Sequence, residues 1–158
     1  MENEDIRIVT LPPMRVASFY AFSSSPEAEA WNKLVIWAKE HTCWQDAPDT
    51  RIFGFNNPDP SAVSPNYGYE YWLVLSPDIH AGEEIKVKDF SGGMYAVLHC
   101  DVKANQFDII GTSWCKLVKW RDASHNKHGN HQWLEEHLTC FESNDSGFVL
   151  DLYLPIVE

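Results

Sequence analysis

The sequence predicts an α+β domain built from two β-α-β-β modules related by a pseudo-twofold axis, with helices packed on antiparallel sheets. Two observations carry this prediction. Short motifs recur in the same order in both halves of the chain, and each half has one amphipathic helix pattern between strand-like runs. A chain of 158 residues can bury a core without disulfides or metals. We therefore expect one domain, residues 1–158, with internal repeats at 1–77 and 83–158.

Three pairs of motifs carry the repeat, and the members of each pair are separated by about 80 residues. The pairs are 6–14 with 85–94, 31–37 with 114–120, and 70–73 with 151–154. Because the order and the spacing are both preserved, coincidence explains the pattern poorly.

Within each repeat, the pattern predicts a strand, a helix and two further strands. The expected strands are 14–22, 51–55 and 67–75 in the first repeat, and 94–101, 139–142 and 148–156 in the second. Ser25-Pro26-Glu27 is a typical helix start, with a serine cap, a proline in the first turn and an acid. The faces of the two helices are Ala30, Trp31, Leu34 and Ala38, and Phe107, Ile110, Trp114 and Leu117. We also expect a short extra helix at 132–138.

Charge and targeting signals limit the partners. The net charge is −11, and the 12 basic residues are scattered among 23 acidic ones. Nucleic-acid binding requires clustered Lys and Arg, so direct contact with nucleic acid is excluded. The sequence shows no signal peptide, and no apolar run approaches the ~18 residues that span a bilayer. We expect a cytoplasmic protein without a membrane contact.

Cysteines and histidines indicate neither a metal site nor a cofactor. The four cysteines are widely spaced, form no CxxC pair and are expected to be buried thiols. His125, His128 and His131 lie in a polar stretch without paired zinc-ligand spacing. Motifs of hydrolases and nucleotide-binding proteins are also absent. We therefore expect a binding protein rather than an enzyme.

Glu70 is the main candidate functional residue. It lies in the strand 67–75, where it shares one face with Trp72 and Val74 while Tyr69 and Tyr71 share the other. Both faces are apolar, and an isolated buried carboxylate costs several kcal/mol unless it is hydrogen-bonded or paired. Desolvation would raise its pKa. The residues leave two readings open: an anchor for a ligand, or a structural carboxylate that tyrosine hydroxyls satisfy.

Asp151 occupies the equivalent position in the second repeat, in the apolar run 150–156. Two related acids on central strands would face a shared groove, so we expect a ligand cavity between the repeats. Because Asp151 lies close to the end of the chain, solvation is the alternative for this residue.

The repeat and Glu70 together resemble the GyrI-like effector-binding domains, which occur in AraC- and MerR-type multidrug regulators and as stand-alone proteins, including forms on integron cassettes. The resemblance covers essentially the whole chain. It is carried by Phe53–Pro60, Tyr67–Trp72, Phe90–Ala96 and Asp151–Ile156. It implies two β-α-β-β modules with a ligand groove between them, and a buried glutamate, matched by Glu70, that anchors lipophilic cations.

The resemblance also implies an aromatic pocket in a drug-binding bacterial protein that acts in transcriptional regulation or drug protection. Candidate lining residues are Tyr20, Phe55, Tyr69, Trp72, Trp114 and Tyr153. The helix-turn-helix segment of the regulators is missing, so a DNA contact would need a partner. Two alternatives to a small-molecule binding protein stay open. The first is an inhibitor or adaptor that binds a protein partner, as gyrase inhibitors do. The second is a hydrolase that uses the pocket carboxylate. The partner of the chain could also be a second copy of itself, in a homo-oligomer.

The charge distribution gives a testable prediction. In a mobility-shift assay at low salt, where electrostatic binding is strongest, micromolar protein should retain neither duplex nor single-stranded DNA. A retained complex that dissociates as salt is added would contradict the exclusion.

Overall fold

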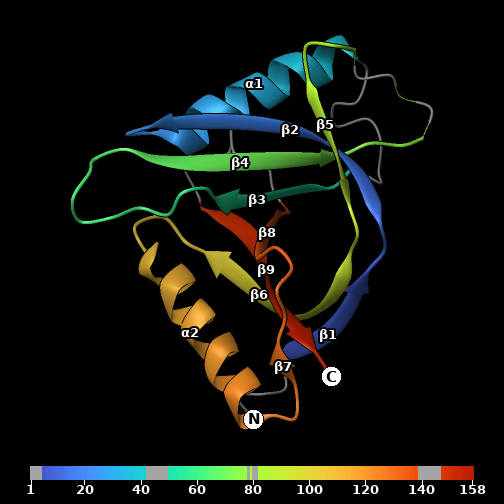
Figure 1. The fold of residues 1–158 in the computed structure, drawn as a ribbon. Helices are drawn as coiled ribbons and strands as arrows, with labels where there is room; N and C mark the ends of the chain where they lie inside the picture. Colours follow the sequence, from blue (N-terminus) through green and yellow to red (C-terminus); the bar gives the residue numbers. More distant parts are fainter. Residues whose placement is uncertain (1–4, 42–49, 78, 80–81, 139–146) are drawn as a thin grey trace. The chain divides into compact units, whose positions relative to one another are not determined.

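The computed structural model describes residues 5–41, 50–77, 79, 82–138 and 147–158. In this part of the chain, nine strands and two helices form an α+β fold, which confirms the predicted class (Figure 1). The chain divides into two compact units. We call Met14–Phe90 the middle unit, and Met1–Pro13 with Ser91–Glu158 the terminal unit. Neither described helix is long and apolar enough to cross a membrane.

The middle unit is an antiparallel sheet with one helix. Its strands follow the order β3-β4-β2-β5. Their bounds are β2 Met14–Ser23, β3 Ile52–Asn56, β4 Tyr67–Val74 and β5 Lys86–Phe90, and α1 spans Pro26–Glu40. The helix begins at the proline as predicted, although Ser25 makes no side-chain capping bond.

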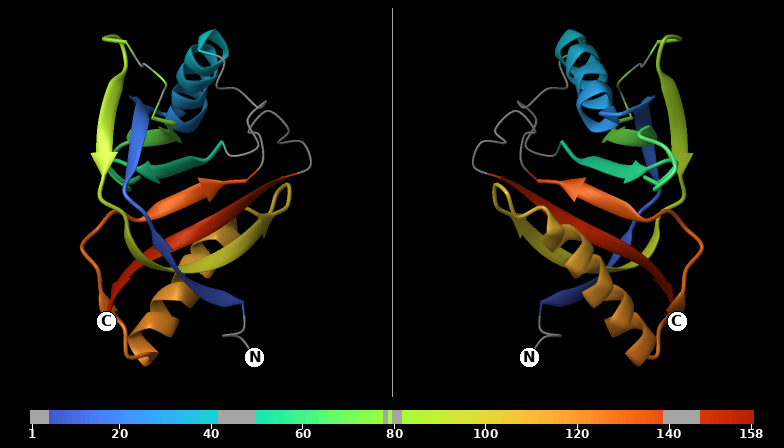
Figure 2. Two further views of the ribbon diagram at one scale, coloured as in Figure 1. Left: turned by 90° about the vertical axis from the view of Figure 1, so that its right-hand side faces the viewer. Right: turned by 90° about the vertical axis from the view of Figure 1, so that its left-hand side faces the viewer.

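The terminal unit has the same arrangement. Its antiparallel strands follow the order β1-β6-β9-β8, and the short strand β7 also pairs with β9. Their bounds are β1 Ile6–Leu11, β6 Gly93–Val102, β7 Lys127–His128, β8 Leu134–His137 and β9 Phe148–Val157, and α2 spans Asp108–Ala123. Figure 2 shows α2 lying against β6 and β9 in both views.

The two repeats exchange their first strands. The strand β1 opens the first repeat but pairs with β6 of the terminal unit. The strand β5 opens the second repeat but pairs with β2 of the middle unit. With this exchange, the orders β3-β4-β2-β5 and β8-β9-β6-β1 match strand for strand. Each compact unit therefore contains one strand from the other repeat, and neither unit coincides with a repeat of the sequence.

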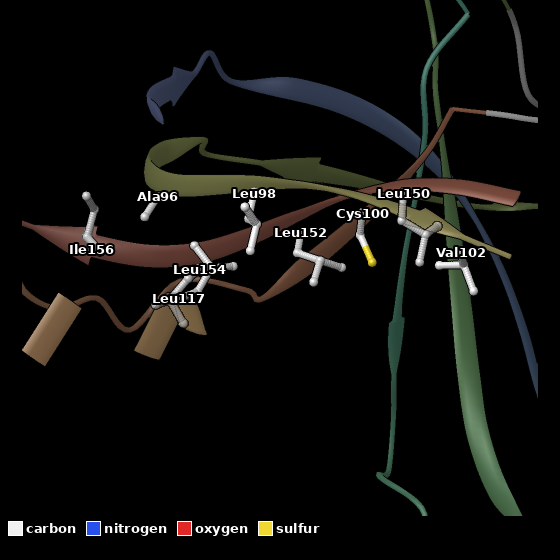
Figure 3. Packing of buried hydrophobic residues seen from close by; sticks show 9 residues of the cluster. All are labelled: Ala96, Leu98, Cys100, Val102, Leu117, Leu150, Leu152, Leu154 and Ile156. Carbon is white, nitrogen blue, oxygen red and sulfur yellow. The ribbon is translucent and has the colours of Figure 1, made fainter. Parts of the chain in front are cut away.

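Each sheet packs one face against its helix. In the middle unit, Trp31 of α1 meets Tyr71 with ring centroids 5.4 Å apart, and Trp37 meets Phe19 at 5.8 Å. In the terminal unit, Leu117 of α2 packs on side chains of β6 and β9 (Figure 3). The cluster consists of Ala96, Leu98, Cys100, Val102, Leu117, Leu150, Leu152, Leu154 and Ile156. Its residues alternate along β9, so the residues between them face the opposite side of the sheet.

Two expectations from the sequence are wrong. The segment 132–138 forms no helix, because Leu134–His137 is the strand β8. Leucine, glutamate and glutamine favour helix locally, but pairing with β9 overrides that preference. Cys115 is exposed, whereas Cys100 is buried as expected. Cys43, Cys140 and the expected strand 139–142 lie outside the described residues.

A glycine permits the close turn of chain beside β4. The amide of Asn57 donates to the Gly68 carbonyl at 2.8 Å, and the Gly68 amide donates to the Pro58 carbonyl at 3.1 Å. A Cβ at position 68 would collide with the carbonyl oxygen of Asn57 and would lie 2.6 Å from the Tyr20 hydroxyl. The backbone approach therefore requires glycine here.

This contact predicts opposite effects for two glycine substitutions. Gly68→Ala should lower the free energy of unfolding by about 1–3 kcal/mol, the usual cost of overpacking. Gly111→Ala is the matched control, because position 111 lies in α2 with no atom within 4 Å of its Cβ. It should raise stability by about 0.5–1 kcal/mol through helix propensity. Urea unfolding of the variants measures both effects, and equal stabilities would contradict the close approach.

Candidate functional site

Glu70 lies on β4, between the neighbouring strands β2 and β3 of the middle unit. Its register partners are Tyr20 on β2 and Phe55 on β3. Paired residues of antiparallel strands share a face, so Glu70 is flanked by two aromatic side chains. The residue is only 2% exposed, which agrees with the burial that the sequence predicted.

The carboxylate of Glu70 is paired with a cation. Lys88 Nζ lies 2.6 Å from Oε2 and forms a salt bridge with it. Ser18 Oγ donates to the same oxygen at 2.7 Å, and Trp72 Nε1 donates to it at 2.6 Å. The other oxygen, Oε1, receives a long hydrogen bond of 3.5 Å from Asn57 Nδ2. Ser18 and Trp72 therefore donate hydrogen bonds to the carboxylate from the same sheet face, and Lys88 of β5 supplies the positive charge.

These contacts reverse the expected direction of the pKa shift. Burial raises the pKa of Glu70, but hydrogen bonds from Lys88, Ser18 and Trp72, together with the charge of Lys88, lower it further than burial raises it. The pKa therefore lies below the ordinary value of 4.5. This direction could not be predicted from the sequence, because β5 lies some distance along the chain and only the sheet brings Lys88 to Glu70 on β4. The described donors to Glu70 are Ser18, Asn57, Trp72 and Lys88, and none of them is a tyrosine hydroxyl, which was the structural alternative.

Aromatic rings lie beside this ion pair. The ring of Trp72 meets Phe55 with centroids 4.9 Å apart and Phe90 at 5.3 Å. Tyr20 is 39% exposed, and its backbone carbonyl accepts a hydrogen bond from Lys33. Four of the residues predicted to line a pocket, Glu70, Trp72, Phe55 and Tyr20, thus share one face of the middle unit.

Tyr69 lies on the other face of β4. It alternates with Glu70, and its ring contacts Tyr71 with centroids 4.8 Å apart. Tyr71 in turn meets Trp31 of α1. The structure therefore places Tyr69 in the core under the helix and does not bring it together with Glu70.

Asp151 occupies the corresponding place on β9, but its neighbours are ionisable rather than aromatic. Its register partners are His99 on β6 and Glu136 on β8. The residue is 5% exposed. Arg7 Nη2 donates to Oδ2 at 2.6 Å, and His99 Nδ1 lies 2.8 Å from Oδ1. The salt bridge to Arg7 shows that Asp151 is not simply solvated at the end of the chain.

Glu136 is a buried acid that the sequence analysis did not select. It is 7% exposed, and the hydroxyl of Tyr153 donates to its Oε1 at 2.7 Å. Tyr153 packs against Tyr95 with ring centroids 5.4 Å apart. These residues share the sheet face of Asp151, because Leu134 and Glu136 alternate in the same register as Tyr153 and Asp151. An alternating strand pattern at 134–137 would have revealed Glu136, but a helix was expected there.

Trp114 lies apart from both acids. It is a partly buried residue of α2 that packs against the cluster of Figure 3, and its ring meets Trp133 at 5.2 Å. That cluster covers the sheet face opposite Asp151. In the described part of the chain, no three His, Cys, Asp or Glu side chains are placed to hold a metal ion.

The lowered pKa of Glu70 predicts a pH-dependent contribution to stability. Glu70→Gln should reduce the free energy of unfolding at pH 7 by about 1–3 kcal/mol, because it removes charge-assisted bonds. The folded protein holds the ionised carboxyl, so this contribution is complete above pH 4.5 and is lost as the pH falls through the lowered pKa. Urea unfolding at pH 7 and near pH 3 measures it, with exposed Glu84→Gln as control. If the difference in unfolding free energy between the wild type and Glu70→Gln were larger near pH 3 than at pH 7, the lowered pKa of Glu70 would be contradicted.

Comparison with solved structures identifies relatives of the fold. The chain is similar to a hydrolase from Listeria innocua with 12% identity and a TM-score of 0.67, over 97% of this chain and 92% of that one. It is similar to the C-terminal domain of EcmrR with 11% identity and a TM-score of 0.66, over 97% of each chain. These identities are low and indicate the fold alone.

A third structure, SAV2435 bound to tetraphenylphosphonium, has 9% identity and a TM-score of 0.61, over 96% of this chain and 93% of that one. No curated protein matches the sequence. The family described as Cass2, integron-associated effector binding protein, matches residues 7–156. This match covers nearly the whole chain and confirms the resemblance drawn from its motifs. The chain belongs to the family of integron-associated effector binding proteins.

Proposed function

We propose that this protein binds amphipathic, cationic small molecules, and that Glu136, Asp151 and Tyr153 of the terminal unit hold the cation. The observation that carries the proposal is the register of β8 and β9. It sets two carboxylates side by side, each less than a tenth exposed. The rings of Tyr95 and Tyr153 share their sheet face. A buried pair of acids beside aromatic rings has the chemistry that a delocalised cation requires.

The physical basis of such binding is desolvation. A carboxylate removed from water attracts a cation more strongly, because solvent screens the interaction less. Aromatic faces add about 0.5–2 kcal/mol through cation–π contacts. A lipophilic cation loses little hydration on entering, and flat rings accept ligands of many shapes. We therefore expect broad specificity among bulky organic cations.

The terminal unit suits this role better than Glu70 does. The carboxylate of Glu70 is neutralised by Lys88 at 2.6 Å, and its Oε2 already accepts three donors. An external cation would have to displace Lys88 first. In the terminal unit, by contrast, the strand register sets two carboxylates side by side: Arg7 contacts Asp151, and the Tyr153 hydroxyl is one donor to Glu136. We accordingly move the proposed anchor from Glu70 to Glu136 and Asp151.

The relatives support this proposal at two levels. The family is described by effector binding, and one similar structure holds tetraphenylphosphonium, a lipophilic cation. Similarity to the C-terminal domain of EcmrR, which another structure contains in a DNA complex, favours a role in transcriptional regulation. With a net charge of −11, such a role would be exerted through a protein partner that contacts DNA.

One observation favours a hydrolase as the second candidate. His99 Nδ1 lies 2.8 Å from Asp151 Oδ1, which orients the ring and leaves Nε2 as a base that could activate water. A similar structure from Listeria innocua is described as a hydrolase. Incubation with an ester-bearing cationic dye decides between the two. Unchanged mass supports binding, and turnover that disappears in His99→Gln supports hydrolysis.

The proposed anchor predicts a selective loss of affinity. Glu136→Gln keeps the shape of the side chain and can still accept from Tyr153, but it deletes the charge. The affinity for tetraphenylphosphonium, measured by tryptophan fluorescence, should fall roughly 10- to 150-fold, since two unit charges about 6–10 Å apart attract by about 1.5–3 kcal/mol at an effective dielectric constant of about 20. Affinity for the neutral triphenylphosphine oxide should change little.

Glu84→Gln serves as the control, because it deletes one negative charge at an exposed position. Equal losses in both variants would mean that the overall field of the protein attracts the cation. If Glu136→Gln and Asp151→Asn both bind as the wild type does while remaining folded, the anchor lies elsewhere and the proposed site is wrong.

A further inference from the structure

The Glu70 cluster of the middle unit has the features of a binding site that is already filled. Three donors converge on one oxygen, Oε2: Ser18 Oγ, Trp72 Nε1 and Lys88 Nζ, all within 2.7 Å. Two of them, Ser18 and Trp72, lie on β2 and β4 and form register partners. They hold the carboxylate in place independently of Lys88. The third donor is an ammonium group brought in by another strand.

Glu70 retains capacity for a further donor. A carboxylate offers about four acceptor sites on its two oxygens, and Oε1 receives only the long bond of 3.5 Å from Asn57 Nδ2 among the contacts described for it. A primary ammonium has three N–H donors. The cluster therefore matches an alkylammonium ion, which can contact both oxygens of the carboxylate.

Apolar surface lies beside the charged groups. The rings of Phe55 and Phe90 contact Trp72, whose Nε1 holds the carboxylate. The alkyl part of an ammonium ion could pack on these rings while its head meets Glu70. The butyl stem of Lys88 is such an alkyl chain, covalently attached to the protein.

The two members of the ion pair differ in their access to water. The side chain of Glu70 is 3% exposed, whereas that of Lys88 is 32% exposed. Lys88 lies on β5, the last strand in the order of the middle unit, and its neighbours Lys86, Val87 and Asp89 are exposed. Lys88 can therefore return to water at lower cost than Glu70, which would keep its place on β4.

We propose that Lys88 is a built-in occupant of an alkylammonium site formed by Glu70, Ser18 and Trp72, and that it excludes external cations from the middle unit. This makes Lys88 a residue that determines specificity. It restricts cation binding to other sites on the protein without taking part in them. The proposal does not depend on the terminal-unit site, because it concerns different residues in a different unit.

The direct experiment replaces the built-in cation with a free one. Lys88→Ala removes the side chain beyond Cβ, and n-propylammonium supplies the missing three carbons and the ammonium group. Adding it at tens of millimolar should raise the Tm of Lys88→Ala by about 2–4 °C, as expected for a ligand that binds the folded state. The wild type, in which the site is occupied, should show no such rise.

Three controls isolate the proposed contact. n-Propanol has nearly the same shape without the charge and should not raise the Tm. Lys86→Ala removes a lysine from the same strand whose register partner is Ser18, and it should behave as the wild type does. The double variant Lys88→Ala/Glu70→Gln should lose the response to n-propylammonium, because the anchor is gone.

Two outcomes overturn the proposal: an equal response to n-propylammonium and n-propanol, or a response that survives in the double variant. If Lys88→Ala is unfolded alone, circular dichroism follows the same titration. Refolding by the ammonium ion supports the site, and failure to refold in both Lys88→Ala and the milder Lys88→Gln refutes it. Tetraphenylphosphonium binding by the wild type and by Glu136→Gln is measured separately, so either proposal can fail alone.

Discussion

The pairing register of the two central strands, β4 and β9, determines which side chains meet in each unit. Because side chains alternate along a strand, a slip of one residue would transfer every buried side chain to the opposite face. The helix-facing residues of β9 are leucines and isoleucine, so such a slip would expose apolar surface and bury charge under α2. The same constraint holds on β4, where Tyr71 packs under α1 and Glu70 faces away. The positions of the acids are therefore a consequence of how the helices are packed.

A shared scaffold supports two different polar sites. Glu70 and Asp151 occupy corresponding positions, but the register partners of Glu70 are Tyr20 and Phe55, whereas those of Asp151 are His99 and Glu136. Each acid also receives a cation from a strand that belongs to the other repeat: Lys88 from β5 and Arg7 from β1. The exchange of first strands thus brings a counterion to each central acid. The corresponding strands β4 and β9 thus carry a carboxylate at the same place between different neighbours.

The energetics of buried charge explain why these counterions matter. An isolated carboxylate in an apolar strand would cost several kcal/mol, and removing one partner of a buried pair is strongly destabilising. Lys88, Ser18 and Trp72 offset this cost for Glu70 and lower its pKa. The same contacts saturate one oxygen of the carboxylate. Stability and the proposed ligand binding would therefore compete for the same group, which supports the proposal of a cation site in the terminal unit.

The sequence alone determined the elements and the family of this protein. Strand and helix periodicity predicted β2, β3, β4, β6, β9, α1 and α2 to within a few residues, since alternation and helical spacing are local signals. The motifs of the GyrI-like domains carried the resemblance, and the burial of Glu70 followed from an apolar strand.

Only the tertiary structure decided that Leu134–His137 forms the strand β8, that Lys88 pairs with Glu70, and that Glu136 is buried. Pairing with β9 overrode the helical preference of 134–137, and the exchanged strand β5 brought Lys88 to Glu70. Partners contributed by strands distant in the chain leave no periodic signal, so the charge balance of each acid could be read only from the folded sheet.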